Sequence, residues 1–323
     1  MQKVEMRIIS VIDTSICSYN IGDQIIMEAV YEIINDIFKD DFVIKLQCIE
    51  KFGILSLKYI YNSDYTFLGG ANVLTSQINK YKQIGFRFKD LLFIKQKIIL
   101  LGVGWWQYQK RPNLYTRFFF NTILSKNFLH SVRDEYTKNM LNSIGIKNVL
   151  NTSCPSVWKL TKEHCNEIPH IKRKNVITTL TDYNKSPVDD EKLINLLLEN
   201  YETIFYWVQG IGDLKYLNSL NIKNRSRIKI IPPKLSEYDR FCQDIDADYI
   251  GTRLHAGIRA LQHKKRSLII AIDNRAKEIA KDINLNIAER GDFAKVKKFI
   301  NEKYVTDLNI PFKNIERWKS QFK

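Results

Sequence analysis

The chain has 323 residues, of which 45% are hydrophobic and 26% are charged, a soluble composition long enough to form two domains. Its formal net charge of +15 predicts an anionic partner: nucleic acid, an anionic membrane, or a phosphorylated or carboxylated substrate. The basic residues stand in short groups such as 172–174, 264–266 and 295–298, without a basic tail or an arginine-rich helix. This distribution favours solvated faces, and we expect no nucleic-acid partner.

The five cysteines are widely spaced, and no Cys-x-x-Cys pair or histidine stands at zinc-ligand spacing. This favours a reducing compartment, and we expect neither a metal nor a cofactor. Residues 1–7 lack the apolar run of a signal peptide, and the apolar stretches 91–106 and 118–124 are too short or too interrupted to span a bilayer. We expect a cytoplasmic protein whose basic charge suits peripheral contact with the anionic inner face of the membrane.

The first half of the chain alternates β-branched runs with segments of helical periodicity. This alternation predicts an α/β fold with a parallel sheet. The expected strands are 7–13, 42–46, 64–68, 97–103 and 128–132, and the expected helices are 24–38, 113–124 and 135–144.

Periodicity is lost in 161–174, which we interpret as a linker between two Rossmann-like domains, 1–160 on the acceptor side and 175–323 on the donor side. The last helix of the second domain is able to cross back to the first. Such domains bind ligands at the carboxyl ends of their strands. The expected strands are 176–180, 203–208, 228–231, 249–252 and 267–272, the expected helices are 188–198, 214–220, 235–242, 256–262 and 292–302, and 310–323 is a tail.

One stretch, 248–259, combines cationic side chains with a strand-to-helix transition. We expect Arg253 and His255 two residues apart in an extended segment, with both side chains on the same side. A helix N-terminus follows them, so the arrangement is typical of an anion site. The alternative is that Arg253 caps a helix or pairs with a surface carboxylate and that His255 is a structural histidine with its hydrogen bonds satisfied.

Polar residues also stand at the strand ends of the first half. Asn20-Ile-Gly22-Asp23 opens the first helix, where Asp23 is either a cap or first-turn acid, or a base for a substrate hydroxyl. Farther along, Arg133 ends a strand, and we expect Asp134 to cap the next helix. The Arg133 guanidinium could take a carboxylate or phosphate in bidentate fashion.

Two glycine turns and one lysine complete the candidate site. Gly69-Gly70 and Gly102-Val-Gly104 could cradle a ligand, although neither forms a dinucleotide fingerprint or a P-loop. Lys277 lies in the first turn of a helix capped by Asp273 or Asn274, where a cation opposes the helix dipole. This position indicates an anionic ligand; a solvated lysine is the alternative.

Taken in order, these motifs make the chain similar to the polysaccharide pyruvyl transferase family over nearly its whole length. Val-Arg133-Asp134 and Arg253-Leu-His255 are the most specific. The resemblance implies a GT-B-like arrangement of two Rossmann-like domains with an interdomain cleft. It also implies transfer of a pyruvyl group from phosphoenolpyruvate to hydroxyls of a sugar in a surface polysaccharide or its precursor, often as a ketal.

The resemblance also suggests roles for the candidate residues. The donor phosphoenolpyruvate would be held by Arg133, His255 and Lys277, with Arg253 beside them; the acceptor is a sugar or a lipid-linked oligosaccharide. Our mechanistic hypothesis makes His255 the acid and Asp23 the base. The other substrate-binding candidates are Asn20, Gly22, Gly69 and Gly70.

The chain departs from the family pattern at three places. Ala71 replaces the third residue of a glycine triplet, Asp273-Asn-Arg-Ala precedes Lys277, and Thr152-Ser-Cys-Pro155 stands where many members have Asp-Pro. Two other functions stay open from the sequence. One is a GT-B glycosyltransferase with a nucleotide-sugar donor, and the other is a non-catalytic anion or nucleic-acid binder.

Overall fold

A computed structural model describes residues 6–323 and divides the chain into two compact units. Unit 1 consists of Met1–Ser18, Ile26–Pro155 and Pro311–Lys323, and unit 2 consists of Tyr19–Ile25 and Ser156–Ile310. Residues 1–5, the start of the segment that lacks a signal-peptide pattern, lie outside the described part of the chain.

Unit 1 is built around a parallel sheet of four strands in the order β2-β1-β3-β4. A parallel bridge between Val103 and Val132 leads from the end of β4 to the pair β5-β6. The strands are β1 (Ile8–Asp13), β2 (Phe42–Gln47), β3 (Tyr65–Gly69), β4 (Ile98–Leu101), β5 (His130–Val132) and β6 (Val149–Asn151). The helices are α1 (Gly22–Ile37), whose first residues belong to unit 2, α2 (Ile54–Asn62), the 3-10 helix η1 (Phe88–Asp90), α3 (Leu91–Ile94), α4 (Leu114–Ile123), α5 (Glu135–Ser143), α13 (Phe312–Lys319) and η4 (Ser320–Phe322).

Unit 2 holds a parallel sheet of six strands in the order β12-β11-β10-β7-β8-β9. This is the doubly wound order, with the direction of winding reversing between β7 and β10. The strands are β7 (Asn175–Thr178), β8 (Ile204–Trp207), β9 (Ile228–Ile231), β10 (Ala247–Gly251), β11 (Ser267–Ala271) and β12 (Ile287–Glu289). The helices are η2 (Pro155–Val157), which begins at the last residue of unit 1, α6 (Lys162–Asn166), α7 (Pro187–Asn200), α8 (Asp213–Ser219), η3 (Arg225–Arg227), α9 (Leu235–Asp244), α10 (Leu254–Gln262), α11 (Asn274–Ile283) and α12 (Phe293–Asn301).

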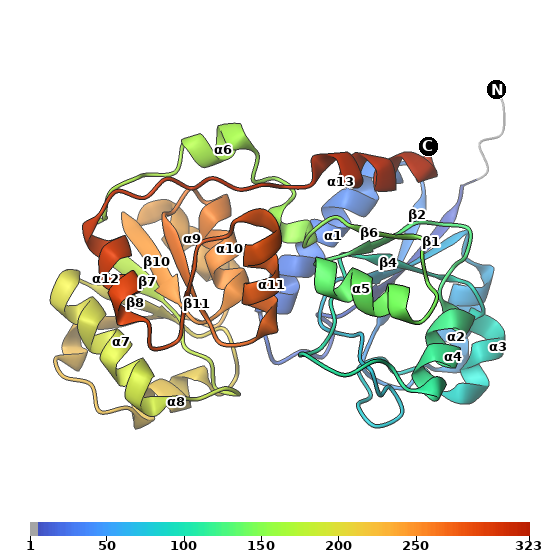
Figure 1. Cartoon of the computed structure of the whole chain (residues 1–323), viewed down its shortest axis with the longest axis horizontal. Coiled ribbons are helices and arrows are strands. Elements are labelled where there is room, and N and C mark those ends of the chain that lie inside the picture. Colours follow the sequence, from blue (N-terminus) through green and yellow to red (C-terminus); the bar gives the residue numbers. More distant parts are fainter. Residues whose placement is uncertain (1–5) are drawn as a thin grey trace. The chain divides into compact units, whose positions relative to one another are not determined.

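Every residue of β4 and β10 is buried, as expected for parallel strands covered on both faces. Helices follow the strands in the sequence and pack against the sheets, so the two parallel sheets confirm the predicted α/β class (Figure 1).

Several elements differ from the expectations. The segment 161–174 contains α6 and lies within unit 2, and α2 and β12 have no counterpart among the predicted elements. The tail 310–323 forms α13 and belongs to unit 1. Arg266 belongs to a basic group that we expected to be solvated, but it is fully buried. Its guanidinium pairs with the Asp248 carboxylate at 3.2 Å.

Candidate functional site

The carboxyl end of β5 places Arg133 directly before α5. Asp134 caps that helix as predicted, because its Oδ1 accepts hydrogen bonds from Thr137 N (2.7 Å) and Thr137 Oγ1 (2.6 Å). The other carboxylate oxygen of Asp134 accepts from Arg133 Nε at 3.1 Å. Arg133 is thereby held beside the N-terminus of a helix, where the backbone dipole also favours an anion.

The Arg133 guanidinium is almost completely buried, with 1% of the residue exposed. Within residues 6–323, its Nη2 makes no hydrogen bond, although it lies 3.1 Å from Asp134 Oδ2. A buried guanidinium nitrogen without a hydrogen bond is costly unless a ligand supplies an acceptor. Arg133 is therefore the residue of unit 1 that we expect to bind an anionic ligand.

The glycines of unit 1 are explained first by packing. A Cβ on Gly104 would lie 2.3 Å from Arg133 Nη2. The Arg133 guanidinium can therefore occupy its observed position only because residue 104 has no side chain. Gly102 has a φ of +67° and packs against Pro155. Gly69 and Gly70 pack against Met27 and against the carbonyl of Gly102, so close contacts within the unit already account for both.

In unit 2, the predicted geometry of Arg253 and His255 is wrong. Arg253 has an extended backbone at the N-cap of α10, but His255 is the second residue of that helix and not part of an extended segment. The helix begins at Leu254, two residues earlier than expected, and Leu254 is buried. Both residues are buried, each with 4% exposed, at the carboxyl end of β10.

Arg253 makes ion pairs, but with the buried Asp213 and the half-buried Asp182 and not with the surface carboxylate of the alternative interpretation. Its guanidinium pairs with Asp213 through Nε (3.2 Å) and Nη2, and Nη2 also donates to Asp182 Oδ1 at 3.0 Å. Asp213 is fully buried, and burial raises the pKa of its carboxyl while Arg253 opposes that rise. Gly210 N donates to Asp213 Oδ2 at 2.7 Å. The arginine therefore joins the turns that follow β7, β8 and β10.

The Asn20 segment belongs to the same strand edge of unit 2. Asn20 Oδ1 accepts hydrogen bonds from Gln209 Nε2 (2.7 Å) and from Gly22 N (3.1 Å), and Asn20 Nδ2 donates to Asp23 Oδ1 at 3.3 Å. A Cβ on Gly22 would lie 2.5 Å from Gln209 Nε2. Asp23 lies half-buried in the first turn of α1, so the structure brings Asn20, Gly22 and Asp23 together with the end of β8.

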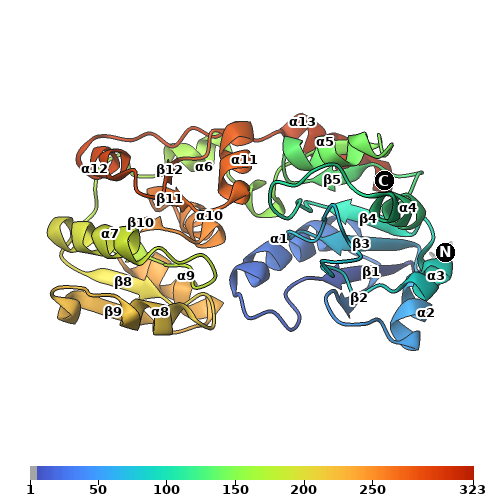
Figure 2. The same cartoon turned by 60° about the horizontal axis from the view of Figure 1, so that its bottom comes forward.

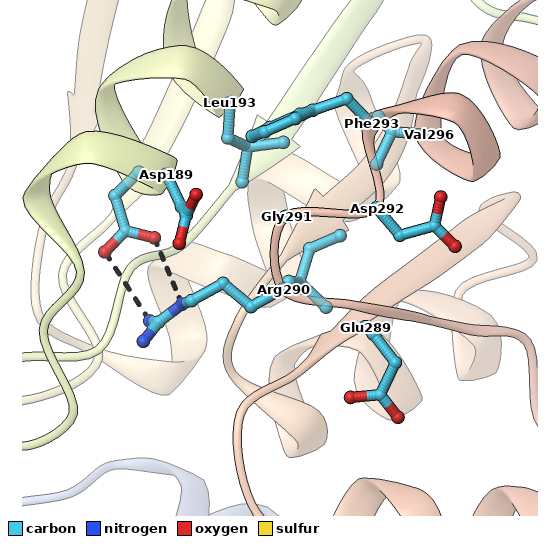
Figure 3. A pocket seen from close by; sticks show the side chains of 10 residues that line it. Asp189, Leu193, Glu289, Arg290, Gly291, Asp292, Phe293 and Val296 are labelled. Atoms are coloured by element: carbon cyan, nitrogen blue, oxygen red, sulfur yellow. Dashed lines mark hydrogen bonds and ion pairs between the residues drawn. The ribbon is translucent and has the colours of Figure 1, made fainter.

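Lys277 lies in the first turn of α11, where Asp273 is the N-cap. Its Nζ is 2.7 Å from Glu289 Oε2 at the end of β12, and 41% of its side chain is exposed. The adjacent hollow is lined by Glu289, Arg290 and α7 and has a volume of only about 10 Å³. Figure 3 shows Arg290 pointing toward α7, with Glu289 and Asp292 turned away from it. This hollow has no room for a substrate.

Sequence reasoning missed four polar residues in the turns that follow the strands of the unit 2 sheet. Tyr183 lies between two arginines: Arg253 Cζ is 5.2 Å and Arg275 Cζ 5.8 Å from the centre of its ring. Arg275 also pairs with Asp273. The other three are Gln209, Asp213 and Asp182. The signal for Gln209 and Asp213 was Gln-Gly-Ile-Gly-Asp directly after a predicted strand, whereas Tyr183 and Asp182 stand in a loop without a motif.

The described residues contain no group of three or more His, Cys, Asp or Glu placed to hold a metal ion. No helix in this part of the chain is long and apolar enough to cross a membrane.

Comparison with known protein families shows to which family the chain belongs. The sequence profile described as "Polysaccharide pyruvyl transferase" matches residues 20–274, most of the chain. The chain belongs to the polysaccharide pyruvyl transferase family. The match includes Arg133, Arg253 and His255 and ends at Asn274, three residues before Lys277. No curated protein sequence matches the chain at a significant level.

Solved structures show the same fold at low sequence identity. The chain is similar to the UDP-GlcNAc 2-epimerase of Methanocaldococcus jannaschii, with 14% identity, a TM-score of 0.53 and coverage of 98% of each chain. It is also similar to the epimerase of Rickettsia bellii, with 12% identity, a TM-score of 0.53 and coverage of 98% of this chain and 94% of that one. These likenesses support the expected GT-B-like fold class.

Proposed function

We propose that this pyruvyl transferase family member moves a pyruvyl group from phosphoenolpyruvate to hydroxyls of a sugar in a surface polysaccharide or its precursor, forming a ketal. The observation that carries the proposal is Arg133, a buried guanidinium beside a helix N-terminus whose Nη2 makes no hydrogen bond within the described residues. A carboxylate or phosphate is the acceptor that this group fits best. Phosphoenolpyruvate carries both.

The proposed chemistry needs one acid and one base. Protonation of C3 of phosphoenolpyruvate makes C2 cationic, and a sugar hydroxyl adds to C2 as it loses its proton. A second hydroxyl of the sugar then displaces phosphate from C2, and the proton that this hydroxyl loses goes to the oxygen of the leaving phosphate. The products are one ketal and one inorganic phosphate. We assign the acid to His255 in the first turn of α10 and the base to Asp23 in the first turn of α1.

The other residues have supporting roles in this proposal. Arg253 is a positioning residue, because both aspartates that hold it belong to neighbouring turns of unit 2. Lys277 is paired with Glu289 and joins the donor site only if that surface pair opens, which costs little. Asn20 and Gly22 fix the turn that carries Asp23. Gly69 and Gly70 lie at the carboxyl end of β3. We propose that they form part of the binding site for the acceptor.

The test begins with ligand binding, because the acceptor is unidentified. Phosphoenolpyruvate at many times its Kd should stabilise the protein by about 2 to 4 kcal/mol, seen as a rise in Tm. Arg133→Ala should abolish this rise, whereas Arg317→Ala, a change at an exposed arginine of α13 in the same unit, should keep it. A rise with Arg133→Ala equal to that of the parent protein would show that this arginine does not bind the donor.

A second measurement separates the two enzyme classes. UDP-GlcNAc, named as a ligand of the similar M. jannaschii epimerase, tests the nucleotide-sugar alternative in the same assay. Stabilisation by UDP-GlcNAc and none by phosphoenolpyruvate would favour a glycosyltransferase. With candidate glycans, mass spectrometry should detect a pyruvyl increment together with released phosphate, and His255→Gln and Asp23→Asn should lower both by about 10²-fold or more.

A further inference from the structure

The positive charge of the chain is concentrated in one part of unit 1. Residues 51–133 contain 13 lysines and arginines and two aspartates, so they carry +11 of the formal net charge of +15. Both aspartates are already bound: Asp90 pairs with Arg87 at 3.0 Å, and Asp64 Oδ2 accepts a hydrogen bond from Ile8 N at 2.8 Å. This segment therefore attracts anions more strongly than the rest of the chain.

The same segment exposes large apolar side chains on adjoining helices. Helices α2, α3 and α4 lie side by side in both views (Figures 1 and 2), and α3 contacts α2, α4 and η1. We call the exposed surface of these four elements the α2–α4 face. Its most exposed apolar residues are Ile54 (85%), Leu92 (84%), Leu114 (83%), Leu55 (67%) and Phe88 (63%).

Ring contacts join the elements of this face into one surface. The ring centres of Tyr61 on α2 and Phe93 on α3 are 6.5 Å apart, and those of Phe88 on η1 and Phe118 on α4 are 6.2 Å apart. Single exposed apolar side chains are normal on a protein surface. A contiguous group of them is typical of an interaction site.

Basic side chains lie among the apolar ones. Lys58 on α2, Lys95 after α3 and Arg117 on α4 are exposed. A groove of about 380 Å³ adjoins the face, because Phe88 and Tyr115 line both, and Lys51 and Lys82 line it as well. The groove offers cations and aromatic rings to the same ligand.

We propose that the α2–α4 face binds the surface of a bilayer that contains anionic lipids. Exposed aliphatic and aromatic side chains gain free energy by entering the boundary between headgroups and acyl chains, and lysines and arginines gain by contact with lipid phosphates. A nucleic acid would use the charge but would leave Ile54, Leu92 and Leu114 in water. The occupant that satisfies both features is an anionic bilayer.

The test is co-sedimentation with vesicles of phosphatidylcholine, with and without 30% phosphatidylglycerol. The parent protein should bind the anionic vesicles at least tenfold more tightly than the neutral ones, and high salt should weaken binding. The double variant Leu92→Asp, Leu114→Asp should reduce binding to anionic vesicles at least tenfold. Both residues are more than four-fifths exposed, so the fold should tolerate the change.

The matched control is Ile171→Asp, at an exposed apolar residue of unit 2 outside the face. It should bind as the parent does, because Ile171 lies outside the face; the control removes one apolar side chain and adds one negative charge, and each of the two substitutions in the double variant does the same. The proposal is overturned if the parent protein does not bind anionic vesicles, or if the Leu92 and Leu114 double variant binds as tightly as the control. Circular dichroism of each variant verifies folding. No step of this test depends on pyruvyl transfer, so its result is independent of the proposed activity.

Discussion

At the scale of single residues, Gly104 and Arg133 are coupled by space. A Cβ at position 104 would lie 2.3 Å from Arg133 Nη2 and 2.4 Å from Arg133 Cζ. The φ of Gly104 is not in the left-handed region, so a side chain there strains no backbone, and only the guanidinium must move. Gly104 is therefore a sensitive probe of the place that Arg133 occupies.

We expect Gly104→Ala to weaken phosphoenolpyruvate binding about as much as Arg133→Ala does, because it displaces the guanidinium. Isothermal titration calorimetry measures the effect. Gly53→Ala is the matched control: nothing lies within 4 Å of its Cβ, and its φ of −78° is ordinary for alanine. Unchanged affinity in Gly104→Ala would mean that Arg133 does not need its observed position to bind the donor.

His130 is a second residue whose behaviour follows from burial. It is fully buried on β5, its Nδ1 accepts from Leu100 N at 3.2 Å, and its Nε2 lies 2.9 Å from Ser125 O. These partners fit the neutral tautomer with the proton on Nε2. Burial lowers the pKa of His130 to about 4, although the Ser125 carbonyl opposes that shift.

A pKa lowered from about 6.5 to about 4 makes stability depend on pH. Below pH 6.5 the unfolded chain takes up a proton that the folded chain excludes, so stability falls as pH drops to about 4, by about 3 kcal/mol in total. Urea unfolding of the parent protein and of His130→Gln at several pH values measures this. In His130→Gln, the free energy of unfolding should lose the part of its pH dependence that His130 causes and keep the part that other groups cause. Equal slopes in both proteins would contradict the lowered pKa.

At the scale of elements, one cluster holds the turns of unit 2 together. Arg253 at the start of α10 contacts Asp213 at the start of α8 and Asp182 after β7. Gly212 N donates to Asp182 Oδ2 at 3.1 Å, and Asp182 N donates to Asp213 Oδ1 at 3.2 Å. The turns at the strand edge are therefore fixed mainly by charge-assisted hydrogen bonds.

We expect Asp213→Ala to loosen the turns after β7 and β8, because it removes one of the two aspartates that pair with the buried Arg253 guanidinium. Removing one partner of a buried ion pair costs about 3 to 5 kcal/mol. Hydrogen exchange should rise in residues 179–184 and 208–213 and stay unchanged in unit 1. Glu237→Ala, in a surface pair with Arg240, is the control and should change neither. Unaltered exchange in both turns would show that Arg253 is not what holds them.

At the scale of the whole molecule, unit 1 is assembled from both ends of the chain. Helix α13 contacts β5 and β6, and Trp318 and Phe322 are buried. Phe67 of β3 lies 6.0 Å from Trp318 and 5.3 Å from Phe322, measured between ring centres. The last thirteen residues thus complete the core of a unit that begins with β1.

We expect Trp318→Ala to destabilise unit 1 by about 3 to 5 kcal/mol, because it leaves a large cavity. Calorimetry should show the transition of unit 1 at a lower temperature while that of unit 2 stays in place. Lys313→Ala, at an exposed position of α13, should shift neither. A fall in both transitions would mean that the two units unfold as one.

Much of the fold was predictable because local patterns dictate it. The apolar run Ile98–Leu101 and the cap residue Asp134 depend only on neighbours in sequence, and both form as predicted. Helix α2 was missed because its exposed face carries Ile54, Leu55 and Tyr59, which hides helical periodicity. The tail was missed because α13 is stabilised by distant aromatic residues.

The sequence by itself determined the alternation of strands and helices, the family motifs and the cations at the strand ends. The tertiary structure alone decided which basic side chains are already bound. Arg253 pairs with Asp213, forty residues away along the chain, and Arg266 lies buried with Asp248, whereas Arg133 keeps a nitrogen without a hydrogen bond in the described chain. The reason is physical: a charged group is stabilised by whatever partner folding brings within about 3 Å of it, and spacing along the chain does not encode that partner.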